Sequence, residues 1–163
     1  MDTLKDLYID QLQDLYSADK QSLSVTKELS EAATNPDLKA ALKRGAEGVK
    51  EGMATIQALI ETHDANPNGK HCKGMEGLVA EARAHALEED FSDDDVRDAS
   101  IISQYQRMTH YALAGYGVVR AFAQRQGLKS DVVRIQECLD QTYGGDREMT
   151  RIAETQVNAA ALG

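Results

Sequence analysis

The sequence predicts an all-α fold, a four-helix bundle with one long crossover connection. Apolar residues recur every three or four positions along several long segments, which is the spacing of a helix that buries one face. No segment shows the alternation of apolar and polar residues that is typical of a half-buried strand. Two long helical segments precede a connection of roughly thirty residues, and two more follow it.

The first pair of long helices is predicted over residues 3–33 and 36–62. Asn35 suits a helix cap and Pro36 suits the first helical position, so the chain is expected to turn there and begin a new helix. The predicted buried stripes consist of Tyr8, Leu12, Leu15, Leu23 and Thr26 in the first helix, and Leu38, Leu42, Val49, Met53, Ile56 and Ile60 in the second.

A shorter helix is predicted inside the connection, over residues 74–87. The acidic stretch that follows, residues 88–98, lacks the alternating acidic loop and distal glutamate of a calcium-binding EF-hand. Ser92 is instead expected to cap the next helix, with residues 93–95 near the positive end of its dipole.

The second pair of long helices is predicted over residues 93–126 and from Ser130 and Asp131 onward. Their predicted buried stripes are Ile101, Tyr105, Met108, Ala112, Tyr116, Val119 and Ala123, then Val132, Ile135, Leu139 and Met149, with Thr142 and Asp146 on the last stripe. One long crossover between two helical pairs is the ferritin-like connectivity. Residues 1–163 are therefore predicted to form a single ferritin-like domain.

Composition limits the classes of function. A net charge of -9 without a basic cluster argues against a nucleic-acid partner. No apolar run approaches the ~18 residues that cross a membrane, and the acidic N-terminus is unlike a signal peptide, so the chain is expected to be cytoplasmic. Cys72 and Cys138 lack metal-binding spacing and are expected to be reduced thiols.

Asp19 lies in the middle of the first apolar stripe, where a bare carboxylate would be costly. Inward carboxylates in a helical bundle commonly hold two iron or manganese ions, with about four carboxylates and two histidines. Glu47, His110 and Asp146 are further candidates, but the E-x-x-H motif is missing from the second and fourth long helices. Glu47 is expected to face solvent, and His110 to be a satisfied or surface histidine.

Several segments resemble the YciE/YciF family of ferritin-like bacterial stress proteins. They are residues 7–21, 35–39 and 72–78, together with His110-Tyr111 ahead of residues 114–117. The resemblance implies a ferritin-like fold, a homodimer, and a carboxylate-bound dimetal centre in typical members.

The resemblance also implies that this chain has lost most of the dimetal ligands. Asp19 stands where typical members carry the glutamate of the first helix. The other ligand positions of the family hold small or uncharged residues here: Gly45, Gly48, Thr109, Ala112 and Thr142. No metal ligand, cofactor or catalytic residue is therefore predicted, and an enzyme is disfavoured.

Three functions remain open. The favoured one is a non-enzymatic, stress-related bundle protein with a metal-free relic of the dimetal site. In that relic Asp19 is held by Thr109, Thr142, tyrosine hydroxyls or water. The second is a di-iron or di-manganese protein with a rearranged site, formed by Asp19, Glu47, His110 and Asp146. The third is a small-ligand binder that uses the space beside Gly45, Gly48 and Gly52.

Overall fold

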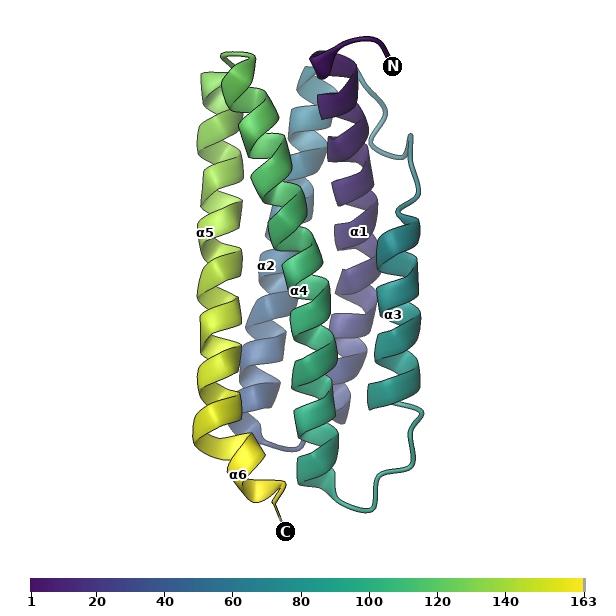
Figure 1. Ribbon diagram of the computed structural model, residues 1–163, viewed down its shortest axis with the longest axis vertical. Coiled ribbons are helices and arrows are strands. Elements are labelled where there is room, and N and C mark those ends of the chain that lie inside the picture. The colour runs from purple at the N-terminus through teal and green to yellow at the C-terminus, as the bar shows by residue number, and fades with distance from the viewer. Residues whose placement is uncertain (163) are drawn as a thin grey trace.

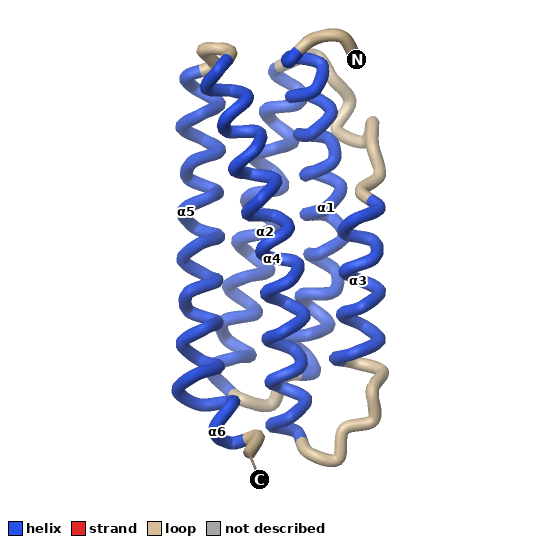
Figure 2. The backbone as a smooth tube through the Cα atoms, in the orientation of Figure 1, coloured by secondary structure: helices blue, strands red, loops and turns tan. Residues whose placement is uncertain are grey.

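The computed structural model is an elongated bundle of four long helices, with a shorter helix along one side (Figure 1). It describes residues 1–162. The helices are α1 (Leu4–Ala32), α2 (Pro36–Thr62), α3 (Lys73–Ala86), α4 (Asp94–Arg125) and α5 (Lys129–Ile152). Throughout the described residues there is no strand, and only loops join the helices (Figure 2). The predicted all-α fold and its crossover are confirmed.

The crossover connects two antiparallel helical pairs. The segment between α2 and α4 runs back along the length of the bundle, so that α2 and α4 point the same way (Figure 1). Within this segment α3 packs against α1 and α4. After α5 the chain makes a π-helical turn, Ala153–Val157, and the short α6, Asn158–Ala160.

Side-chain caps mark where α2 and α4 begin. The Asn35 side chain accepts hydrogen bonds from the backbone N–H groups of Asp37 and Leu38, as predicted for the start of α2. The expectation for α4 was wrong by one residue. Asp93, not Ser92, is its cap, because the Asp93 carboxylate accepts hydrogen bonds from the N–H groups two and three residues further on.

Asp98 joins the turn between α1 and α2 to α4. Its carboxylate is fully buried and accepts hydrogen bonds from Thr34 N at 2.9 Å, Thr34 Oγ1 at 2.8 Å and Asn35 N at 2.6 Å. These donors satisfy a charge that burial would otherwise make unfavourable. Asp98 is the last residue of the acidic stretch 88–98, and the sequence pattern does not predict this contact.

The apolar core is divided into two clusters, one toward each end of the bundle. Val25, Leu29 and Ile101 belong to one cluster, and Leu12 and Ile135 to the other. Six apolar residues of the predicted stripes are only half-buried: Leu23, Val49, Met53, Ala112, Val132 and Leu139. The region between the two clusters is lined largely by polar residues, so the apolar core is not continuous along the bundle.

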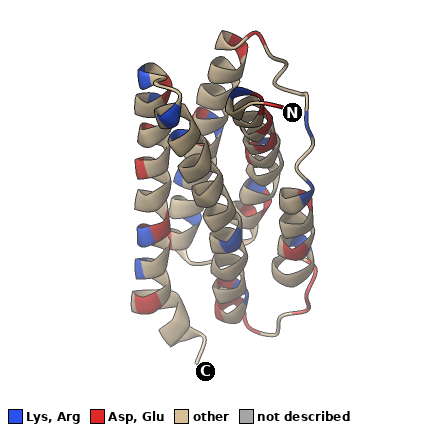
Figure 3. Cartoon of the chain, turned by 45° about the horizontal axis from the view of Figure 1, so that its top comes forward, with Lys and Arg blue, Asp and Glu red and all other residues tan. Residues whose placement is uncertain are grey.

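Charged residues are spread along the outer faces of the helices, and acidic residues mark the connection between α3 and α4 (Figure 3). Of the helices that the structure describes, none is both long enough and apolar enough to cross a membrane.

Candidate functional site

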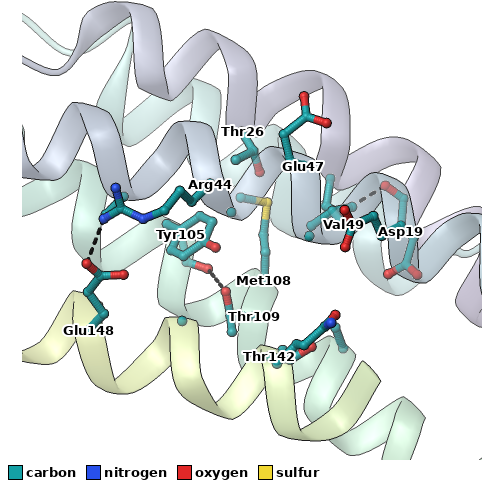
Figure 4. A pocket seen from close by; sticks show the side chains of 18 of the residues that line it. Asp19, Thr26, Arg44, Glu47, Val49, Tyr105, Met108, Thr109, Thr142 and Glu148 are labelled. Carbon is teal, nitrogen blue, oxygen red and sulfur yellow. Dashed lines mark hydrogen bonds and ion pairs between the residues drawn. The ribbon is translucent and has the colours of Figure 1, made fainter. Parts of the chain in front are cut away.

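A cavity of about 530 Å³ lies between the two core clusters, and all four long helices contribute to it. We call it the central cavity. Its polar wall consists of Asp19, Ser22, Thr26, Tyr105, Thr109 and Tyr116, and its apolar wall includes Ala41, Val49, Met108 and Ala112. Exposed side chains of α2 and α5 surround its mouth, where Arg44 and Glu148 form an ion pair of 2.6 Å (Figure 4).

Asp19 is the buried acid of the central cavity, with only 2% of its surface exposed. The hydroxyl of Tyr116 donates a hydrogen bond of 2.8 Å to Asp19 Oδ2. Burial raises the pKa of Asp19 to about 7, and the hydrogen bond from Tyr116 limits this rise. Burial and the nearby Asp19 charge raise the pKa of Tyr116 well above its ordinary value, so this hydroxyl remains a donor.

The second carboxylate oxygen of Asp19 has no such donor. Among the hydrogen bonds of the described residues, one reaches Oδ2 and none reaches Oδ1. Among the described residues, the side-chain polar atoms that are both fully enclosed and without a hydrogen-bond partner do not include Oδ1, so this oxygen is accessible. It therefore borders the central cavity, where a ligand or water can reach it.

Two tyrosines fill part of the space that was expected to be open to a ligand, beside Gly45 and Gly52. A side chain at Gly45 would collide with the hydroxyl of Tyr105, and one at Gly52 with the hydroxyl of Tyr116. At Gly48, by contrast, no atom lies within 4 Å of where a Cβ would stand. The glycines of α2 thus have two roles. Gly45 and Gly52 let the tyrosines approach, and Gly48 leaves open space beside the cavity.

Thr109 and Thr142 do not hold Asp19, which corrects that part of the prediction. Thr109 Oγ1 donates to the Tyr105 carbonyl at 3.0 Å, and Thr142 Oγ1 donates to the Cys138 carbonyl at 2.7 Å. A threonine in a helix has such a carbonyl within reach one turn earlier, and this local acceptor is used in both cases. The predicted tyrosine hydroxyl is the group that does bind Asp19.

The other candidate ligands do not meet in one place. Glu47 lies at the cavity mouth with 68% of its side chain exposed, as expected. His110 is a surface histidine, and its Nε2 lies 3.0 Å from Asp146 Oδ2 in the groove between α4 and α5. Asp146 was predicted on the core-facing stripe, but it pairs there with His110 and Gln106 and does not line the central cavity.

These residues do not fit a dinuclear metal centre. Within residues 1–162, no three His, Cys, Asp or Glu side chains are placed to hold a metal ion. Asp19 is the one buried acid of the cavity wall, since Glu47 and Glu51 are exposed at the mouth and Glu148 pairs there with Arg44. A dimetal bundle site uses about four carboxylates and two histidines.

A third buried carboxylate, after Asp19 and Asp98, lies at the end of the bundle where α1 begins. Asp131 Oδ2 accepts a hydrogen bond of 2.9 Å from the Tyr8 hydroxyl and lies 2.8 Å from His63 Nε2. This contact joins α1, α5 and the end of α2. Tyr8 lies on a predicted apolar stripe, but Asp131 and His63 are remote from it along the chain, so helical periodicity does not predict this contact.

The helices and the carboxylate at their centre define a ferritin-like helical-bundle protein. The chain belongs to the family described as "Domain of unknown function (DUF892)", whose model matches residues 3–162. It is 31% identical to protein YciF of Escherichia coli strain K12 over 163 residues, which is 99% of this chain and 96% of that protein.

Solved structures agree with this assignment. The crystal structure of the E. coli stress protein YciF matches with a TM-score of 0.89 and 30% identity, over 97% of this chain and 99% of that one. YcfI from Rhodopseudomonas palustris matches with a TM-score of 0.86 and 27% identity, over 92% and 94% of the two chains. The resemblance to the YciE/YciF family is confirmed.

Proposed function

We propose that this chain is a non-enzymatic bundle protein whose central site is a metal-free relic of a dimetal centre. The observation that carries the proposal is the contact between Asp19 and Tyr116, in which an uncharged hydroxyl donates to the one buried acid of the cavity wall. A dimetal site needs a cluster of carboxylates, and such a cluster would repel itself without cations. Hydroxyls and glycines surround Asp19 instead, so there is no carboxylate cluster whose mutual repulsion cations would have to offset.

The metal content of the purified protein tests this proposal. The chain is produced without a metal-binding tag in medium that contains iron and manganese, and is measured by inductively coupled plasma mass spectrometry. We expect less than about 0.1 equivalent of either metal per chain, because one carboxylate and a phenol make a poor site. An Asp19→Asn variant should have the same metal content. About two equivalents in the native chain, lost in the variant, would refute the proposal.

The rearranged dimetal site is a weaker candidate. It requires Asp19, Glu47, His110 and Asp146 to converge, yet the last two pair with each other outside the central cavity. Turning α4 and α5 inward would expose their buried apolar faces to water. The same metal measurement separates this candidate from the metal-free one.

Small-ligand binding is a second candidate function, and the central cavity favours it. A volume of about 530 Å³ lies within the range of ligand pockets, which combine apolar walls with a few polar groups. The open space at Gly48 adjoins the same walls. Ligand binding is compatible with a non-enzymatic role.

A stress-related role, a homodimer and a cytoplasmic location complete the proposal. The stress-related role is supported by the similarity to YciF, which is described as a stress protein. The homodimer comes from the family resemblance, and light scattering behind size-exclusion chromatography tests it. A mass near twice the 17.8 kDa of one chain is expected, and a mass of one chain would refute it.

A further inference from the structure

We propose that the central cavity binds a small organic cation, a primary amine or amidinium group on an apolar body, with the cationic group against Asp19. This inference rests on the metal-free site proposed above, because a metal ion would compete for the same carboxylate.

The cationic group would bind the Asp19 oxygen that lacks a hydrogen-bond donor. Asp19 is 2% exposed, its Oδ2 is bonded to Tyr116, and its Oδ1 borders the cavity without a donor from the described residues. Thr26, which is 1% exposed, adds an oxygen to the same wall. An ammonium group has three N–H donors, so it can donate both to Asp19 Oδ1 and to the Thr26 oxygen. A charge-assisted hydrogen bond in a buried site is stronger than a neutral one.

The rest of the cavity suits an apolar body. Figure 4 shows Met108 between Tyr105 and Val49, next to the space that Asp19 borders. The flexible thioether of Met108 can adapt to ligands of different shapes. A cavity of about 530 Å³ is far larger than a bare inorganic ion needs, so an organic ligand fills it better.

The charges at the mouth favour a cation over an anion. Two basic side chains face three acidic ones there: Lys43 and Arg44 against Glu47, Glu51 and Glu148. Arg44 is already engaged by Glu148 at 2.6 Å, which leaves its charge largely neutralised. The protein as a whole carries a net charge of -9. The excess of acidic side chains at the mouth and the negative net charge of the protein both attract cations and repel anions.

Three probes of the same shape test the inference: benzylamine, benzyl alcohol and benzoate. Each is titrated into full-length protein that has been treated with a chelator, so that bound metal cannot obscure the result. The readout is the methyl signal of Met108 in proton–carbon correlation spectra. Met75, which is buried outside the cavity, provides the internal control signal.

Benzylamine is expected to shift the Met108 signal and to bind at least about tenfold more tightly than benzyl alcohol, with benzoate weakest. In Asp19→Asn the difference between amine and alcohol should fall to within about twofold, because the charge is removed and the shape is kept. Equal affinities of amine and alcohol in the native chain would overturn the inference.

Two glycine variants show whether the probe occupies the cavity. Gly48→Leu places a side chain in the open space beside the cavity and should abolish the Met108 shift. Gly117→Leu is the matched control. Its site is also open, but it lies outside the cavity and binding should be unchanged. A shift that persists in Gly48→Leu would refute the inference, as would no shift with any probe. Neither result changes the metal content, which alone decides the proposed metal-free site.

Discussion

Replacing Asp19 by asparagine is expected to stabilise the fold above pH 7 and to leave its stability unchanged near pH 4. Asparagine keeps the shape of the carboxyl group, and its side-chain oxygen can accept the hydrogen bond that Tyr116 now gives to Asp19. It carries no proton that can be lost in this pH range. The difference between the two proteins therefore isolates the free energy of ionising Asp19 inside the bundle.

The size of the effect follows from the burial of Asp19. Its pKa is raised from an ordinary 3.8 to about 7, and each pKa unit corresponds to about 1.4 kcal/mol. The unfolded chain releases the proton near pH 4, whereas the folded chain retains it to about pH 7. The native free energy of unfolding therefore falls as pH rises through this window, by about 4 kcal/mol from this group. Above pH 7 the loss is complete.

Urea unfolding, followed by far-ultraviolet circular dichroism between pH 4 and pH 8, measures this difference. Asp19→Asn should match the native free energy of unfolding at pH 4 and exceed it by about 4 kcal/mol at pH 8. Glu47→Gln removes an exposed carboxylate at the mouth of the same cavity and serves as the control. Its difference from the native chain should stay within about 0.5 kcal/mol at every pH.

One result would refute this reasoning. If Asp19→Asn is less stable than the native chain at pH 8 by about 1 kcal/mol or more, the ionised carboxylate must be stabilised by a group other than Tyr116. A bound cation would have that effect, and the metal content of the protein then shows whether that cation is a metal ion.

Two further predictions concern close contacts and buried hydrogen bonds. Gly45→Ala should lower the free energy of unfolding by about 1–3 kcal/mol, because its methyl group meets the Tyr105 hydroxyl. Gly48→Ala, at an open site on the same helix, should raise it by up to about 1 kcal/mol, and a loss there equal to that of Gly45→Ala would contradict this account. Asp98→Ala should cost about 3 kcal/mol by removing a buried carboxylate that accepts hydrogen bonds from partly buried donors of the α1–α2 turn. The exposed Asp94→Ala should cost less than about 1 kcal/mol, and equal losses in the two aspartate variants would refute the role of Asp98. Urea unfolding at neutral pH measures all four variants.

Most of the fold could be predicted because helix formation depends on local patterns. The spacing of apolar residues marks the buried face of each helix, and Asn35 with Pro36 marks a boundary that depends on neighbouring residues alone. Ser92 and Asp93 are both good caps, so the residue types alone do not decide between them, and in the structure Asp93 is the cap.

The centre of the bundle was less predictable because periodicity defines a face only broadly. A helical stripe spans about 100° or more, so residues at its edges can point into the core or into a groove. Val49 and Asp146 are such residues. Val49 lines a cavity and not a packed core, and Asp146 turns toward His110.

The sequence by itself determined that this is a ferritin-like bundle with a carboxylate on the inward stripe of its first helix. Only the tertiary structure decided what Asp19 contacts, because its partner Tyr116 lies 97 residues away on another helix. It also decided that the space beside Gly45 and Gly52 belongs to tyrosines, and that a cavity remains next to Gly48. The rotation and separation of packed helices set these contacts, and they depend on the shapes of all the side chains between them.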